Sequence, residues 1–116
     1  MQVGFQIETN ELFNLNIKDM ESKIQNAALV EKEAIANFTF PDKEILESED
    51  AVKLRRQELE RAMKLGNVEK GKIKIVFEDS EGPKQVDTTI WGVTDKRIIL
   101  KQGLVIPINR ILAVKI

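Results

Sequence analysis

The chain lacks the side chains on which most catalytic sites depend. Its 116 residues contain no histidine, cysteine or tyrosine. Thiol nucleophiles, Cys/His zinc sites and histidine general bases are therefore excluded. The remaining reactive groups are carboxylates, amines, guanidinium groups and hydroxyls, and the only serines are Ser22, Ser48 and Ser80. We therefore expect a protein that is not an enzyme and that holds no cofactor.

Two groups of carboxylates could form a reactive site. Acid/base chemistry needs paired carboxyl groups, and the candidates in the C-terminal part are Asp79, Glu81, Asp87 and Asp95. They fall in expected turns or at outward strand positions, where carboxylates stay ionised. A hard cation could be bound by an acidic group, here Glu44, Glu47, Glu49 and Asp50. Because the start of a helix explains this group, we assign no catalytic and no metal-binding residue.

Basic residues are concentrated in the C-terminal part. Residues 70–116 carry nine Lys/Arg against five Asp/Glu, a charge of +4, whereas residues 1–69 carry nine against fourteen, a charge of −5. A basic face could bind phosphate groups. The alternative is solubilising charge that also blocks the edges of short strands. The possible partner or phosphate contacts are Lys72, Lys74, Lys96, Arg97, Lys101, Arg110 and Trp91.

Trp91 is the only tryptophan of the chain. If Val86, Thr88 and Ile90 face the core of a strand, Trp91 faces outward. An exposed tryptophan in a chain with few aromatic residues would indicate a contact surface. The alternative is a reversed or bulged register that places Trp91 beneath a helix. The two interpretations predict opposite exposures for this side chain.

The N-terminal part is expected to be helical. Val3, Phe5 and Ile7 alternate with polar residues, which is typical of a short strand or an ordered arm. Apolar residues at helical spacing then predict helices over about 17–36 and 43–65, joined as a hairpin.

The second predicted helix carries an apolar stripe and ends near a glycine. Gly66 is expected to cap its C-terminal end. Ile45, Val52 and Leu59 are spaced by seven residues. This stripe could be the seam of a homodimer, or it could pack against the first helix.

The period of the apolar residues falls to two beyond Lys70. Five short antiparallel strands are expected in the segments 72–78, 86–93, 97–101, 104–108 and 111–116. Pro107 should lie at a sheet edge or a strand end, because proline cannot donate to a ladder. The predicted fold is a single α+β domain over 1–116, with a helical part (1–69) and a small five-stranded barrel or bent sheet (70–116).

Two family resemblances concern residues 72–116. A helix, a strand, a longer strand, two short strands, a tight turn at 107–111 and a closing strand follow one another, and this order resembles small Sm-like barrels of RNA-binding proteins. The segments 93–100 and 106–111 are also similar to bacterial pleckstrin-homology-like domains, with a Thr-x-x-Arg strand start and a Pro-x-x-Arg-Ile step. No functional residue is carried over from either family.

These patterns lead to one expected function and one alternative. We expect a non-enzymatic interaction or adaptor module that acts as a homodimer and binds an unidentified protein partner. The alternative is a nucleic-acid-binding regulator that uses the basic face, with affinity that falls steeply as salt rises. The N-terminus has no basic region followed by an apolar run, and no apolar segment is long enough to span a bilayer. The expected location is therefore the cytoplasm, without membrane insertion.

Overall fold

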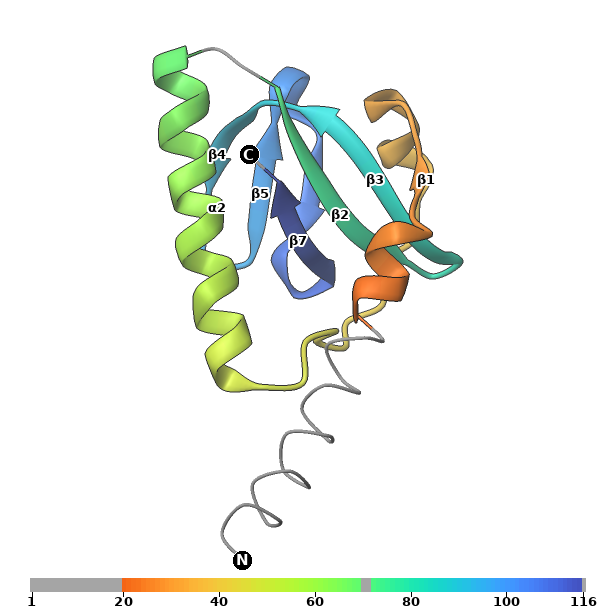
Figure 1. Ribbon diagram of the computed structural model, residues 1–116. Coiled ribbons are helices and arrows are strands. Elements are labelled where there is room, and N and C mark those ends of the chain that lie inside the picture. The colour runs from red at the N-terminus through yellow and green to blue at the C-terminus, as the bar shows by residue number, and fades with distance from the viewer. Residues whose placement is uncertain (1–19, 70–71, 116) are drawn as a thin grey trace, which may run out of the picture.

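The computed structural model describes residues 20–69 and 72–115, and over these residues the fold is α+β (Figure 1). The long helix is α2 (Glu49–Glu69), and the short 3-10 helices are η1 (Lys32–Asn37), η2 (Lys101–Gly103) and η3 (Ile108–Arg110). The strands are β1 (Ala28–Leu29), β2 (Ile73–Asp79), β3 (Gly82–Thr88), β4 (Ile90–Val93), β5 (Arg97–Leu100), β6 (Val105–Pro107) and β7 (Ile111–Lys115). The α+β class predicted from the sequence is confirmed.

The strands form two sheets. The first has the order β1-β3-β2-β7 and the second the order β4-β5-β6. After β6 the chain passes through η3, and β7 returns to pair antiparallel with β2. In Figure 1, α2 stands along one side of the strands and β1 lies on the other side. All five predicted strand segments form strands, and Pro107 ends the edge strand β6 as expected.

The prediction of a single barrel or bent sheet needs correction, because the strands of the described residues form two sheets and neither closes into a barrel. The expected second strand is interrupted at Thr89, so that β3 and β4 belong to different sheets. At this point α2 approaches the chain closely. A Cβ atom added to Gly66 would lie 3.3 Å from Cγ2 of Thr89. Gly66 therefore permits a close approach inside α2, and it does not cap the helix as predicted, because α2 continues to Glu69.

The predicted first helix is wrong over most of its length. Residues 20–25 are helical, but the chain then becomes extended and forms β1, which pairs parallel with β3. Residues 1–19, which include the predicted N-terminal strand and the start of this helix, lie outside the described residues. The side-chain amide of Gln85 donates to the carbonyl of Ala27 at 2.7 Å. The backbone carbonyl of Gln85 accepts from the backbone N–H of Val30 at 2.9 Å. These bonds satisfy an extended backbone on the edge of β3, so no helical hairpin forms.

Helix α2 begins later than predicted. The hydroxyl oxygen of Ser48 accepts from the backbone N–H of Ala51 at 3.0 Å, which is the pattern of a helix N-cap. Residues 43–48 are not helical. Glu44 in this segment instead pairs with Arg55 on the second turn of α2, so the acidic residue that was expected to start the helix holds the preceding connector against it.

Two apolar clusters form the core. The main cluster packs α2 against both sheets and includes the fully buried Phe77, whose ring lies 5.9 Å from that of Phe40 and 6.1 Å from that of Phe38. The second cluster covers the other face of the four-stranded sheet and includes Val76 and Leu112. Within the two described ranges, no helix combines the length and apolar character needed to cross a bilayer.

The apolar stripe of the predicted dimer seam faces these clusters. Leu59 is 0% exposed in the main cluster, while Ile45 and Val52 pack against the second. Val52 and Leu59 contact this chain's own core because α2 lies against the strands, and Ile45 contacts it from the segment that precedes α2. Leu59 offers no surface to a second chain, whereas Ile45 and Val52 are half-buried.

Candidate functional site

The three-stranded sheet has one buried and one open face. In its register, Val93, Ile98 and Ile106 are neighbours on the core side, and the last two are completely buried. The open side, which we call the outer face, carries the side chains that alternate with them. Its members are Trp91, Arg97, Ile99, Val105 and Pro107.

Trp91 stands on the outer face and is 56% exposed. The register of β4 and β5 shifts between Ile90 and Gly92, so Trp91 is the extra residue of a β-bulge. Bulges turn side chains away from the regular pleat. Trp91 therefore points outward. The bulged register of the alternative is present, but it does not place Trp91 beneath the helix. Ile99 fills the space over Gly92 beside it, with Cδ1 3.5 Å from the position of an added Cβ.

A cleft lies beside β6. It has a volume of about 960 Å³, at the upper end of the ~300–1,000 Å³ typical of ligand pockets. It is bounded by η1, the connector 38–44, the start of α2 and the strands β5 and β6. Its apolar walls are formed by Ile35, Ala36, Phe38, Phe40, Val52, Leu104, Val105, Pro107 and Ile108. Val105 is 40% exposed, so the outer face continues into the cleft at this residue.

Two cations, Lys96 and Arg97, stand at the rim of the cleft. Both are exposed, and neither makes an ion pair with any described residue. Arg97 is paired with Pro107 across β5 and β6, so its side chain lies on the outer face next to the cleft.

The turn that carries these cations is held in place. The hydroxyl oxygen of Thr94 accepts from the backbone N–H of Arg97 at 3.0 Å. The guanidinium group of Arg56 on α2 donates to the carbonyls of Thr94 and Asp95 at 2.8 and 2.9 Å. Because the turn is fixed from two sides, the cations lose little backbone entropy when they bind a partner.

A buried ion pair supports the inner end of the cleft. Arg55 is 6% exposed and donates to Glu44 from both terminal nitrogens, with an Nη1–Oε2 distance of 2.7 Å. Its Nη1 also donates to the carbonyl of Ile111 at 3.2 Å. Burial alone would raise the pKa of Glu44, but the hydrogen bonds from Arg55 and from the amide of Leu46 outweigh it and lower the pKa below its ordinary value. This pair fixes the connector that forms one wall.

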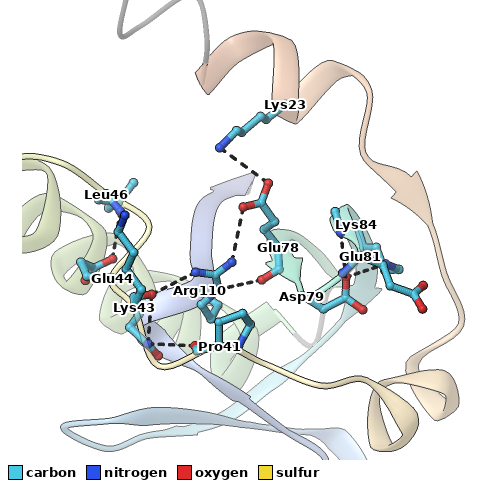
Figure 2. A network of polar contacts seen from close by, with 12 residues as sticks. Lys23, Pro41, Lys43, Glu44, Leu46, Glu78, Asp79, Glu81, Lys84 and Arg110 are labelled. Atoms are coloured by element: carbon cyan, nitrogen blue, oxygen red, sulfur yellow. Dashed lines mark hydrogen bonds and ion pairs between the residues drawn. The ribbon is translucent and has the colours of Figure 1, made fainter.

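Arg110 is a structural residue and not the phosphate contact that was predicted. It is 7% exposed, and its Nε donates to the carbonyl of Glu78 at 2.9 Å. Its Nη1 donates to the carbonyl of Lys43 at 3.0 Å, and Nη2 lies 3.4 Å from a carboxylate oxygen of Glu78 (Figure 2). The side-chain amide of the neighbouring Asn109 donates to the carbonyl of Asp42 at 2.7 Å. Together, Asn109 and Arg110 hold the connector 41–44 against η3.

Asp79 and Lys84 form a second buried pair, at the turn between β2 and β3 (Figure 2). Oδ1 of Asp79 accepts from Nζ of Lys84 at 2.6 Å and from the amides of Glu81 and Gly82 at 3.1 Å. Burial would raise the pKa of Asp79, but these bonds outweigh it and the pKa lies below its ordinary value. Nζ of Lys84 also lies 5.0 Å from the centroid of the Phe38 ring.

The other predicted cations lie away from the cleft. Lys72 precedes the first residue of β2, and Lys74 pairs across the sheet with Lys115 and Asp87. Its Nζ is 4.0 Å from a carboxylate oxygen of Asp87. Lys101 follows β5 at the opposite end from Lys96. The structure therefore brings Lys96 and Arg97 together, and it places Lys72, Lys74 and Lys101 elsewhere.

The sequence did not reveal the cleft. Its walls depend on Phe38 and Phe40, which lie in the gap between the two predicted helices and were given no role from the sequence. The available signal was compositional, because two of the five phenylalanines stand within three residues, just before Pro41. Among the described residues, no group of three or more acidic side chains is arranged to hold a metal ion.

Comparisons of the chain with protein families, with curated proteins and with solved structures gave no match. The function of the site must therefore be argued from its geometry and its charges.

Proposed function

We propose that this protein is a non-enzymatic interaction module that binds a segment of a partner protein at the cleft and the adjoining outer face. The observation that carries the proposal is the continuity of three exposed features. Trp91 and Val105 present apolar surface, the cleft provides concave apolar walls, and Arg97 lies next to Pro107 at the rim without an ion pair to any described residue. Apolar surface rimmed by fixed charges is typical of protein interaction sites.

The carboxylates support the non-enzymatic part of the proposal. A general acid at neutral pH needs a raised pKa. Glu44, the acid that lines the cleft and is bound by Arg55, has a lowered pKa, and so does the buried Asp79. A lowered pKa favours the ionised form, which suits the ion pairs that these two carboxylates make with Arg55 and Lys84.

Neither the homodimer nor the Sm-like resemblance adds a partner to the proposal. The dimer seam loses its support because Leu59 is fully buried. An Sm-like arrangement is supported by the order of the elements along the chain, which is α2, β2, β3–β4, β5, β6, η3 and β7. We propose this likeness for the architecture alone, since it assigns no binding residue.

The nucleic-acid alternative has less support. A phosphate-binding face needs several cations on one surface. Arg110 is buried, Lys74 is paired with Asp87, and Lys101 lies at the far end of β5 from Lys96. The remaining cations are too few and too scattered to favour a phosphate backbone over a protein segment.

The proposal can be tested with a random-peptide display library. Peptides enriched on the wild-type protein should bind in solution and should lose affinity by about tenfold or more when Ala36 in the cleft wall is changed to Phe, because the ring fills the cleft. The matched control is Ala28→Phe, another exposed alanine outside the cleft. The proposal is wrong if no peptide is enriched, if both variants bind equally, or if a labelled random RNA pool binds and competes at this site.

A further inference from the structure

The edge of β6 that faces the cleft pairs with no other strand of the described residues. β6 is the last strand of its sheet. Its flanking residues bond inward, because the carbonyl of Leu104 accepts from β5 at 2.7 Å and the N–H of Ile108 donates back across the ladder at 2.9 Å. Backbone groups alternate along an antiparallel strand. The N–H and C=O of Val105 and the C=O of Pro107 therefore point away from β5.

We propose that the partner segment is an extended peptide that adds to the edge of β6 as a further strand and carries one or more carboxylates toward Lys96 and Arg97. This inference rests on the proposed function and names the chemistry of its partner. The edge offers one donor and two acceptors to the backbone of such a peptide, which is the pattern that strand addition uses.

The surroundings of the edge select the side chains of the peptide. In an added strand, alternate side chains point to opposite sides. Those on one side would continue the row formed by Val105 and Pro107 on the outer face, and those on the other would meet Ile35 and Phe38 in the cleft wall. Both sides favour apolar residues.

The charges at the rim favour a partner peptide that carries negative charge. Lys96 and Arg97 are the unpaired cations next to this edge, and the turn that carries them is fixed by Thr94 and Arg56. A carboxylate placed beside a guanidinium group gains a charge-assisted hydrogen bond, which is stronger than a neutral one. The cleft also contains Asp42 and Asp95, so a basic peptide is the alternative that the experiment must reject.

The first test removes the single outward donor of β6. Val105→Pro deletes the N–H that points away from β5 and leaves the ladder to β5 intact. Leu104 has ψ 147°, which is compatible with a following proline. The affinity for the enriched peptides, measured by fluorescence anisotropy, should fall by about tenfold. The matched control Val105→Ala keeps the N–H and should lose less than about threefold.

A second measurement does not depend on the folding of a variant. Each enriched peptide is N-methylated at one position at a time, which removes one backbone donor. Methylation should weaken binding at alternate positions, because only every second residue of an added strand faces β6. Equal affinities for all methylated forms, or an unchanged affinity for Val105→Pro, would overturn strand addition.

The third measurement concerns the charge. The enriched peptides should be rich in Asp or Glu, and Arg97→Glu should lower their affinity by about tenfold, with a smaller salt dependence. Lys101→Glu is the control, since Lys101 is exposed in η2, directly after the far end of β5. Basic or neutral peptides, or equal losses in both variants, would overturn the acidic partner. Loss of binding in Ala36→Phe together with full binding in Val105→Pro would leave the proposed function standing and remove only the further inference.

Discussion

The molecule uses its basic residues in two different ways. In the interior, Arg55 and Arg110 hold the connector 38–44 against α2, η3 and the strands through ion pairs and hydrogen bonds to backbone carbonyls. At the rim of the cleft, Lys96 and Arg97 are exposed and unpaired among the residues that the structure describes. The comparison teaches that the basic residues of the chain do not form one surface. Some of them build the walls of the cleft, and some of them remain available to a ligand.

The largest effect is expected from the interior. Arg110→Met should lower the free energy of unfolding by about 3 kcal/mol, because it leaves the carbonyls of Glu78 and Lys43 without their donor and uncovers a partly buried carboxylate. Urea denaturation followed by circular dichroism measures the difference. The matched control is Arg97→Met at the rim, which should change stability by no more than about 0.5 kcal/mol. Equal losses in the two variants would contradict the distinction between interior and rim.

A smaller effect is expected from the second buried pair. Asp79→Asn should lower the free energy of unfolding by about 2 kcal/mol at neutral pH, because Lys84 loses a charge-assisted partner. The control is Asp87→Asn, since Asp87 is exposed and lies 4.0 Å from its lysine. A loss for Asp87→Asn as large as that for Asp79→Asn would show that burial does not set the difference.

The pH dependence of stability gives a sign as well as a size. The pKa values of Glu44 and Asp79 are lower in the folded protein than in the unfolded chain. Their contribution is therefore fully present above the ordinary carboxyl pKa values of about 4, and it is lost as the pH falls through the lower folded values. Urea titrations at successive pH values should show wild-type stability falling toward that of Asp79→Asn in this acidic range. A constant difference between the two proteins would contradict the assignment.

The smallest effect is expected at the surface, away from the cleft. Lys74→Ala should change the free energy of unfolding by no more than about 0.5 kcal/mol, because its pair with Asp87 is solvent-exposed. The same variant should leave peptide binding at the cleft unchanged. A loss of affinity comparable to that of Arg97→Glu would show that the cations of the two regions act together, which would favour the nucleic-acid alternative.

The strands and the long helix were predictable, and the first predicted helix was wrong over most of its length. Alternation in residues 73–77 and 97–100 was enough to place strands there, although Val76 is buried on the second face of β2 as well. The exposure of Trp91 was left open by the sequence, because a bulge changes the side to which a residue points. The helical spacing over 26–36 misled because Gln85, far along the chain, captures the backbone at Ala27 and Val30 in an extended form. Similarly, Gly66 is a residue type that often ends helices, but here it lies within α2 and allows the helix to approach Thr89 closely.

By itself, the sequence determined the α+β class, the long helix, the strand segments beyond residue 70 and the exclusion of histidine and cysteine chemistry. These follow from local periodicity and from composition, which need no knowledge of distant contacts. Only the tertiary structure decided which cations are buried and that Phe38 and Phe40 meet β6 to form a cleft. The physical reason is that a guanidinium group has the same charge wherever it lies. Whether it builds the fold or meets a ligand depends on carbonyls and carboxylates that are remote in sequence, such as those of Lys43 and Glu78 around Arg110.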